Sequence, residues 1–160
     1  MPVMLKEAAI THRLADRKRI RREDVATLKA CATPKSKDHN QVTIEVTGES
    51  GKLYEIRSRR KSDPNDPMAF SIILSCTEGN RTVNLIRCNG HHEEHTNQIE
   101  KNNGHPDAVI PENTCHIHRI TERYQEAKRL PESFAVPTRA YSNFDEAVEH
   151  MCSNFGISVI

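Results

Sequence analysis

The fold is decided by the stretch FSIILSCTEGNRTVNLIRC, residues 70–88. Its first part, residues 70–76, is mostly apolar and has the length of a buried strand. After a polar turn at residues 78–80, residues 82–88 form a second run of similar length. Two such runs joined by a short turn predict a pair of antiparallel strands at the centre of a sheet.

A hairpin is predicted before this pair, and a short strand after it. Apolar and polar residues alternate over residues 42–46 and again over residues 54–57, and this period of two predicts a β-hairpin with one solvated face. Residues 115–120 predict a further strand. In that strand His116 and His118 lie on the same face, because alternate side chains share a side.

Helices are expected at both ends of the chain. Apolar residues recur at nearly helical spacing over residues 4–17 and 23–32, and more clearly over residues 142–156. For the last helix, Ser142 is the expected N-cap and Gly156 the expected C-terminal cap. The predicted fold class is α+β: an antiparallel meander of four to five strands, with N-terminal helices and one C-terminal helix packed on it.

The 160 residues fit a single domain, residues 1–160, because independent domains commonly have about 100 to 150 residues. It comprises a basic helical region (1–33), a sheet with a long histidine-rich loop (41–120) and the C-terminal helix (142–156). No apolar run approaches the roughly 18 to 20 residues that cross a bilayer, so we expect a soluble, cytoplasmic protein without a membrane partner. The five cysteines form no C-x-x-C pair, which predicts buried free thiols rather than disulfides or a thiolate zinc site.

Positive charge is concentrated in the first part of the chain. Residues 1–61 contain 15 Lys and Arg against 8 Asp and Glu, whereas residues 62–160 contain 8 against 14. Such asymmetry indicates a surface for a polyanion or an acidic partner. The candidate binding residues are Arg17, Lys18, Arg19, Arg21, Arg22, Arg57, Arg59 and Arg60. The alternative is a solvated helix face whose charges are partly matched by nearby acidic residues.

The histidines are concentrated in two segments of the second half of the chain. Five of the nine histidines lie in the segments GHHEEH (residues 90–95) and CHIHR (residues 115–119). Histidine is a weak former of helix and strand and is only intermediate in burial, so packing does not explain this clustering. The polar connection 89–114 is also longer than compact domains usually contain without a functional reason. We therefore expect the functional site here.

One interpretation of these histidines is RNA cleavage without a metal ion. One imidazole removes the 2′-hydroxyl proton, a second protonates the leaving oxygen, and an arginine offsets the charge that develops on phosphorus. An ordinary histidine pKa of about 6.5 suits both proton transfers. The candidate catalytic residues are Arg87, His91, His92, His116 and His118.

Two further interpretations remain open. In a metal-dependent hydrolase, zinc is the cofactor and the candidate ligands are His92, His95, His116 and His118, although segment 92–95 lacks the H-E-x-x-H spacing. In a non-enzymatic module, the basic N-terminal region docks an acidic protein or a nucleic acid, and the histidines only order the loop. We assign His12, His39 and His150 to such exposed or supporting positions.

The order of motifs over residues 81–156 is also informative. The segment LIRCNGHH (residues 85–92) is followed by a loop, by HIH (residues 116–118), and by Pro137 before the terminal amphipathic helix. This order resembles a group of small uncharacterised bacterial proteins, and it is similar in outline to the TumE-type toxins of toxin–antitoxin pairs. The resemblance implies a small α+β protein that interferes with translation or RNA and has an antitoxin-like partner. The functional positions that it implies are Arg87, His91, His92, His116 and His118.

Overall fold

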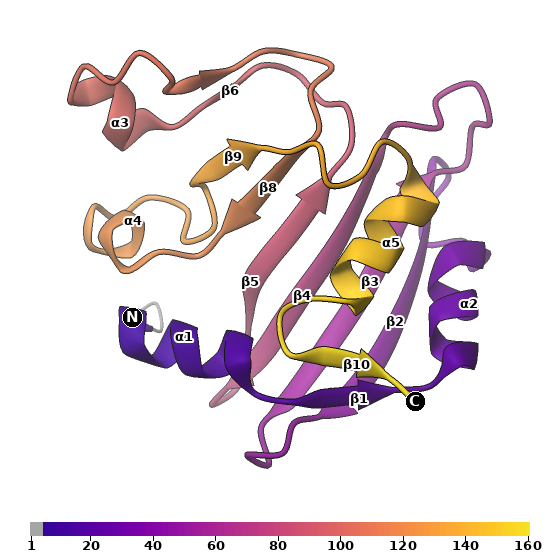
Figure 1. Cartoon of the computed structure of the whole chain (residues 1–160). Coiled ribbons are helices and arrows are strands. Elements are labelled where there is room, and N and C mark those ends of the chain that lie inside the picture. The colour runs from indigo at the N-terminus through magenta and orange to yellow at the C-terminus, as the bar shows by residue number, and fades with distance from the viewer. Residues whose placement is uncertain (1–4) are drawn as a thin grey trace.

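The computed structural model describes residues 5–160 and is built around a six-stranded antiparallel sheet (Figure 1). In spatial order its strands are β2 (His39–Thr47), β3 (Leu53–Lys61), β4 (Phe70–Glu78), β5 (Arg81–Asn89), β8 (His116–Arg119) and β9 (Ala135–Pro137). Successive strands of the sheet are neighbours, as in a meander. The predicted α+β architecture is confirmed.

The strands that the sequence predicts are present, and one more extends the sheet. The two runs within residues 70–88 form β4 and β5, and the alternating residues 42–46 and 54–57 lie in β2 and β3. The additional edge strand β9 has three residues, one of them Pro137, and pairs with β8. A segment this short shows no period, and proline is rare in strands except at edges, so the sequence gives no pattern for β9.

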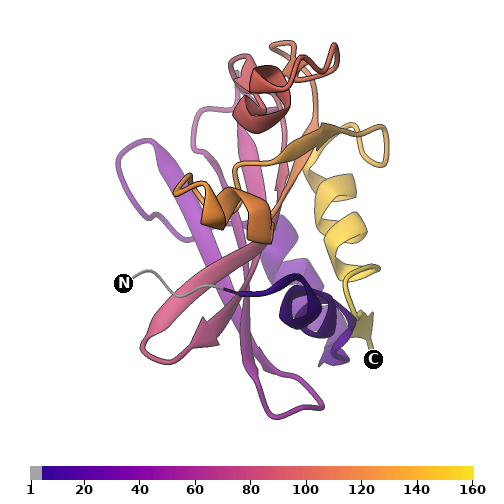
Figure 2. The same ribbon diagram turned by 90° about the vertical axis from the view of Figure 1, so that its left-hand side faces the viewer.

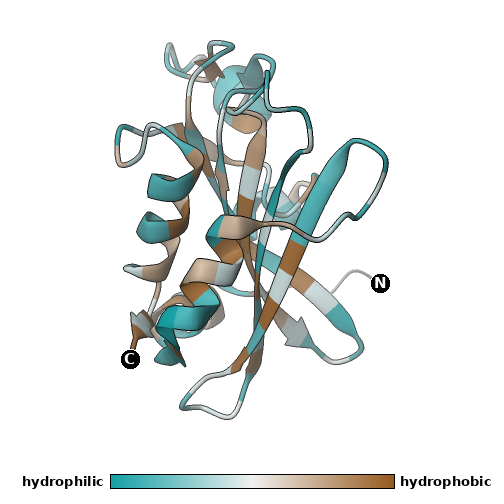
Figure 3. Cartoon of the chain, turned by 90° about the vertical axis from the view of Figure 1, so that its right-hand side faces the viewer, coloured by the Kyte–Doolittle hydropathy of each residue, from teal (hydrophilic) through white to brown (hydrophobic). Residues whose placement is uncertain are grey.

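Helices α2 (Arg22–Ala30) and α5 (Phe144–Cys152) pack on one face of the sheet (Figures 1 and 2). The main core lies between these helices and the strands. The predicted apolar stripe of α5 is buried there; it consists of Phe144, Ala147, Val148 and Met151. Figure 3 shows apolar positions gathered between α5 and the sheet, with hydrophilic positions on the outer side of the helix.

The caps of α5 differ from the prediction. The N-cap is Asn143 rather than Ser142, because the Asn143 side chain accepts a hydrogen bond from the Glu146 backbone N–H at 2.8 Å. The C-cap is Ser153. Gly156 lies three residues further on, in the turn before β10 (Ile157–Val159), where its φ of +76° is one that glycine adopts without strain.

The N-terminal region contains two short helices with a strand between them. Helices α1 (Glu7–Ala15) and α2 correspond to the predicted helices at 4–17 and 23–32, and the predicted start at residue 4 lies outside the described residues. Between them, β1 (Lys18–Ile20) pairs in parallel with β10. The sequence does not indicate β1, because its three residues lie within a charged run.

The histidine-rich connection contains regular structure. Strands β6 (His95–Thr96) and β7 (Val109–Ile110) pair with each other, α3 (Gln98–Asn102) lies between them in the chain, and α4 (Glu122–Glu126) follows β8. Asn97 connects this segment to the edge strand β9. Its side chain donates a hydrogen bond to the Ala135 carbonyl at 2.7 Å and accepts one from the Ala135 N–H at 2.9 Å. Among the described residues, no helix has the length and apolar character that a membrane span requires.

The side of the sheet opposite α2 and α5, which we call the open face, carries polar side chains in rows that cross the strands. Paired residues on neighbouring strands point to the same side. One row consists of Gln41, Arg59, Ser71, Asn89 and His116. The next row consists of Thr43, Arg57, Ile73, Arg87 and His118. The prediction that His116 and His118 share a face is confirmed.

Candidate functional site

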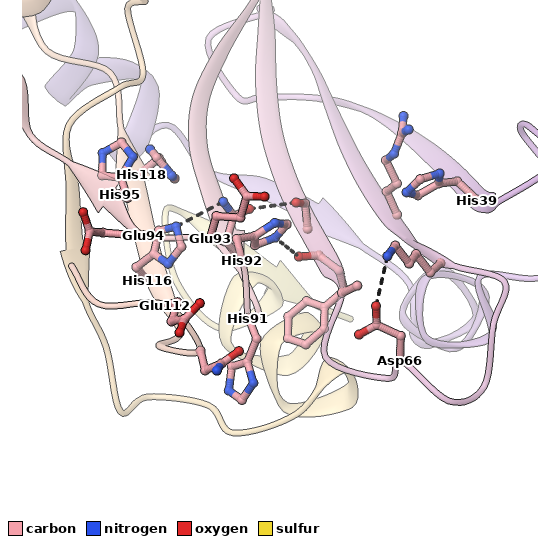
Figure 4. A pocket seen from close by; sticks show the side chains of 17 residues that line it. His39, Asp66, His91, His92, Glu93, Glu94, His95, Glu112, His116 and His118 are labelled. Atoms are coloured by element: carbon pink, nitrogen blue, oxygen red, sulfur yellow. Dashed lines mark hydrogen bonds and ion pairs between the residues drawn. The ribbon is translucent and has the colours of Figure 1, made fainter. Parts of the chain in front are cut away.

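A hollow of about 710 Å³ opens at one end of the open face (Figure 4). His92 and His95 line it from the segment after β5, and His116 and His118 line it from β8. The ring centroids of His95 and His118 are 4.8 Å apart, those of His116 and His118 5.0 Å, and those of His92 and His116 6.1 Å. Two histidine-bearing segments that are distant in the sequence therefore meet in one site.

Backbone carbonyl groups fix the orientation of both β8 histidines. Nδ1 of His118 lies 2.9 Å from the Glu132 carbonyl oxygen, and Nδ1 of His116 lies 2.8 Å from that of Thr114. A carbonyl only accepts, so in the neutral rings Nδ1 carries the proton and Nε2 is an acceptor. Nε2 of His116 lies 3.4 Å from the Asn89 amide nitrogen. Nε2 of His118 has no hydrogen-bond partner among residues 5–160.

The other two imidazoles are held through Nε2. Nε2 of His95 lies 3.1 Å from the side-chain oxygen of Asn97, and this oxygen is identified by the hydrogen bond that it accepts from the Ala135 N–H. Nε2 of His92 lies 3.2 Å from the Phe70 carbonyl oxygen. In its neutral form, each of these two rings donates from Nε2 and keeps Nδ1 as an acceptor.

Burial keeps the β8 histidines uncharged at neutral pH. His118 is 9% exposed, and burial, with smaller contributions from His116, His95 and Arg87, lowers its pKa from 6.5 to about 3. His116 is 2% exposed, and burial also lowers its pKa. The neutral His118 ring has an unpaired Nε2 that can accept a proton or a hydrogen bond from a bound group, although burial makes it a weaker base than an exposed imidazole.

Arg87 lies beside His118 in a network of charged and amide side chains. The two residues are paired across β5 and β8. Nη2 of Arg87 donates to the Glu132 carboxylate at 3.3 Å, and the Asn84 amide donates to the same oxygen at 3.2 Å. The Asn84 oxygen accepts a hydrogen bond from Nη2 of Arg57 at 2.6 Å. Glu132 therefore contacts the site twice, since its backbone orients His118 and its side chain holds Arg87.

The other predicted residues near the sheet divide between its two faces. His91 and Arg59 line the hollow, and Arg57 lies beside Arg59 on the open face. Arg60 lies on the side of the helices, where its guanidinium carbon is 4.9 Å from the centroid of the Phe144 ring. Arg60 therefore shares no binding surface with Arg57 and Arg59.

The N-terminal basic residues lie away from the hollow. In Figure 1, β1 and the hairpin strand β6 are at opposite ends of the molecule. All four arginines, at positions 17, 19, 21 and 22, are exposed. Nη1 of Arg17 lies 3.7 Å and Nη2 of Arg19 lies 3.3 Å from Oε1 of Glu49.

Lys18 does not belong to any exposed surface. It is fully buried, and its Nζ donates to the carbonyl oxygens of Arg13, Asp16 and Phe155 at 2.7 to 2.8 Å. The prediction that Lys18 is a binding residue was wrong. The acceptors that satisfy a buried lysine come from distant parts of the chain, so a basic run does not reveal which of its members is internal.

Several residues of the site were not predicted from the sequence. His39, which we assigned to the supporting histidines, lines the hollow from β2. Asn89, Asn97 and Glu132 contact or orient imidazoles, yet each is an ordinary polar residue in its local context. Only the spacing His95-x-Asn97 could have indicated one of these contacts. Alternate residues of an extended segment lie on the same side, so the Asn97 side chain is expected next to the His95 ring.

The predicted zinc ligands approach one another without forming a metal site. Among the described residues, no group of three or more His, Cys, Asp or Glu side chains is arranged to hold a metal ion. This arrangement gives no support to zinc binding by His92, His95, His116 and His118, which stays a prediction.

The cysteines do not supply a nucleophile to the site. All five are free and buried, as predicted. Burial raises the pKa of the Cys88 thiol to about 12 and also raises that of Cys115, which adjoins His116. These thiols stay protonated at neutral pH, and only the thiolate is a strong nucleophile.

No protein-family model, no curated protein and no solved structure matches this chain. The similarity to TumE-type toxins therefore stays a prediction.

Proposed function

We propose that the protein cleaves RNA in the hollow, by transfer of a phosphodiester to the adjacent 2′-oxygen. The observation that carries the proposal is the 4.8 Å separation of the His95 and His118 rings next to Arg87, which is paired with His118 across β5 and β8. Two imidazoles that differ in environment, with a guanidinium beside one of them, provide a base, an acid and a charge stabiliser for this reaction.

In this proposal His118 is the general base and His95 the general acid. The unpaired Nε2 of His118 takes the 2′-hydroxyl proton as the 2′-oxygen forms its bond to phosphorus. The bond from phosphorus to the 5′-oxygen breaks, and protonated His95 gives the proton on Nδ1 to that oxygen, while its Nε2–H stays on Asn97. The products are a 2′,3′-cyclic phosphate and a free 5′-hydroxyl, and the two histidines have exchanged protonation states.

Substrate binding and proton transfer are coupled in this mechanism. Burial and the neighbouring Arg87 disfavour the charged form of His118, which lowers its pKa. A phosphodiester bound at Arg87 brings negative charge to the same place and raises the pKa toward the range in which a general base is most effective. His118 thus becomes a better base when the substrate is present.

His116 is a positioning residue in this proposal. Its Nδ1 is bonded to the Thr114 carbonyl and its Nε2 lies against Asn89, so neither nitrogen is available for proton transfer. The Tyr141 hydroxyl lies 2.8 and 3.1 Å from the backbone carbonyl oxygens of Asn89 and His116, which share its single proton. These contacts keep the adjoining ends of β5 and β8 together under the reacting groups.

Cleavage of an RNA oligonucleotide by purified variants, in the presence of EDTA, tests the proposal. We expect a 2′,3′-cyclic phosphate product from the unmodified protein. Replacing His118 or His95 by Ala should lower the rate about 100-fold or more, because each removes a proton-transfer group. His12→Ala, an exposed change on α1, should leave the rate unchanged.

Other results would contradict the proposal and favour a different function. RNA binding without cleavage, weakened by reversing the charges of Arg21 and Arg22 and not by the histidine changes, would favour a binding module. Cleavage that EDTA abolishes would favour a metal-dependent hydrolase.

A further inference from the structure

The open face holds a second group of polar side chains beyond the histidines. Nε of Arg57, Oγ of Ser75 and Nε of Arg87 are buried, and each lacks a hydrogen-bond partner among residues 5–160. The register places them together: Arg57 and Arg87 are both paired with Ile73, and Ser75 lies two residues further along β4 on the same face. Buried polar groups are nearly always paired, so three unpaired donors at neighbouring positions point to a ligand that accepts hydrogen bonds.

Two side chains of this group, Asn84 and Arg87, donate hydrogen bonds to the same carboxylate oxygen of Glu132. Oε1 of Glu132 accepts from Nη2 of Arg87 at 3.3 Å and from the Asn84 amide at 3.2 Å. Both distances exceed those of close charge-assisted hydrogen bonds, which are about 2.7 to 2.9 Å. One carboxylate oxygen therefore accepts two long hydrogen bonds, while Nε of Arg57, Oγ of Ser75 and Nε of Arg87 on the same face have no acceptor among residues 5–160.

The local charge also favours an added anion. Arg57 and Arg59 lie on β3 and Arg87 lies on β5, on either side of β4 on the open face, and Glu55 and Glu132 are the carboxylates that face Arg57. Burial disfavours the charge of Arg57, and the like charge of Arg87 acts in the same direction. A group with more negative charge than a carboxylate would offset both effects.

We propose that Arg57, Ser75, Asn84 and Arg87 form a phosphate-binding subsite, and that the Glu132 side chain occupies it until a phosphate group displaces it. A tetrahedral phosphate offers more acceptor oxygens than a carboxylate and matches the paired donors of arginine. That the phosphate belongs to RNA rests on the proposed function. The group then bound here is a backbone phosphate next to His118. The Glu132 carbonyl keeps its hydrogen bond to His118 while the side chain moves.

Titration with inorganic phosphate, followed by NMR at the arginine Nε–H groups, tests the subsite. In the unmodified protein, phosphate should shift the Arg57 and Arg87 signals with saturation. Glu132→Gln removes the competing charge and should tighten phosphate binding about tenfold, whereas Arg57→Gln should weaken it about tenfold. Glu126→Gln, which removes an exposed carboxylate of α4, is the matched control and should change nothing.

The proposal is overturned if phosphate leaves both arginine signals unchanged, or if Glu132→Gln binds phosphate no more tightly than Glu126→Gln. Should Glu132→Gln fail to fold, Glu132→Asp replaces it, because the shorter side chain keeps the charge but withdraws it from Arg87. The same variants are then assayed on RNA. Phosphate binding without RNA cleavage would contradict only the proposed function, whereas cleavage without phosphate binding would contradict only the subsite.

Discussion

Nε2 of His95 and the side-chain oxygen of Asn97 are joined by a hydrogen bond of 3.1 Å, and the Ala135 backbone N–H holds this oxygen in place. The Asn97 side chain makes both hydrogen bonds available from Ala135, one to its carbonyl and one from its N–H. The imidazole is therefore oriented by the edge strand of the sheet, although His95 lies on the hairpin of β6 and β7. Rigid support of this kind is what a proton-transfer group requires.

We predict that Asn97→Ala lowers both stability and RNA cleavage. Removal of the amide leaves the buried backbone groups of Ala135 unpaired, at a cost of roughly 2 kcal/mol, and releases His95. Urea unfolding and the cleavage rate measure the two effects. Asn102→Ala, an exposed change on α3, is the control. Full activity in a destabilised Asn97→Ala protein would show that His95 does not need this support.

The lowered pKa of His118 predicts a pH dependence of stability. The unfolded chain binds a proton near pH 6.5 and the folded chain near pH 3, so between these values the unfolded state holds more protons. Stability is therefore complete above pH 6.5 and falls as the pH is lowered toward 3. The slope reaches up to about 1.4 kcal/mol per pH unit for this histidine, and the lowered pKa of His116 adds to it with the same sign.

Urea unfolding between pH 4.5 and 6.5 measures this slope, since carboxylates contribute less there than at lower pH. His118→Gln should reduce the slope, whereas His12→Gln should not. An unchanged slope in His118→Gln would mean that His118 is protonated equally in both states.

The three carbonyl contacts of Lys18 predict a large effect of a neutral substitution. Lys18→Met keeps the aliphatic volume but leaves three carbonyl oxygens without their donor, so the free energy of unfolding should fall by roughly 3 kcal/mol or more. Thermal and urea unfolding are the measurements. The neighbouring exposed change Arg19→Met should cost less than about 0.5 kcal/mol, and equal effects of the two changes would contradict the structural role of Lys18.

Gly90 is predicted to accept no larger residue. A Cβ at this position would overlap the Met68 carbonyl oxygen and lie 2.7 Å from the Phe70 ring. Because Phe70 also supplies the carbonyl that holds His92, Gly90→Ala should displace that imidazole and cost about 1 to 3 kcal/mol in stability. Gly104→Ala, in open space at φ +74°, carries only backbone strain. Equal stability and cleavage for the two variants would contradict this expectation.

Sequence patterns predict the strands well because burial on a sheet imposes a local period. That period identified residues 42–46 and 54–57 and placed His116 and His118 on one face, as the structure confirms. The approach of His95 to His118 depends instead on the pairing of β5 with β8 and on the Asn97 contact with β9, and no local pattern encodes either. The same holds for Lys18, whose acceptors include a carbonyl 137 residues away.

The parallel pairing of β1 with β10, residues 18–20 with 157–159, has a consequence for biosynthesis. β1 leaves the ribosome long before residues 157–159 have been translated, so the strand between α1 and α2 has no pairing partner until those residues emerge. Contacts of such long sequence separation form late and slowly. β1 is therefore exposed to proteases for longer during synthesis than β4 and β5, which pair with each other within one hairpin.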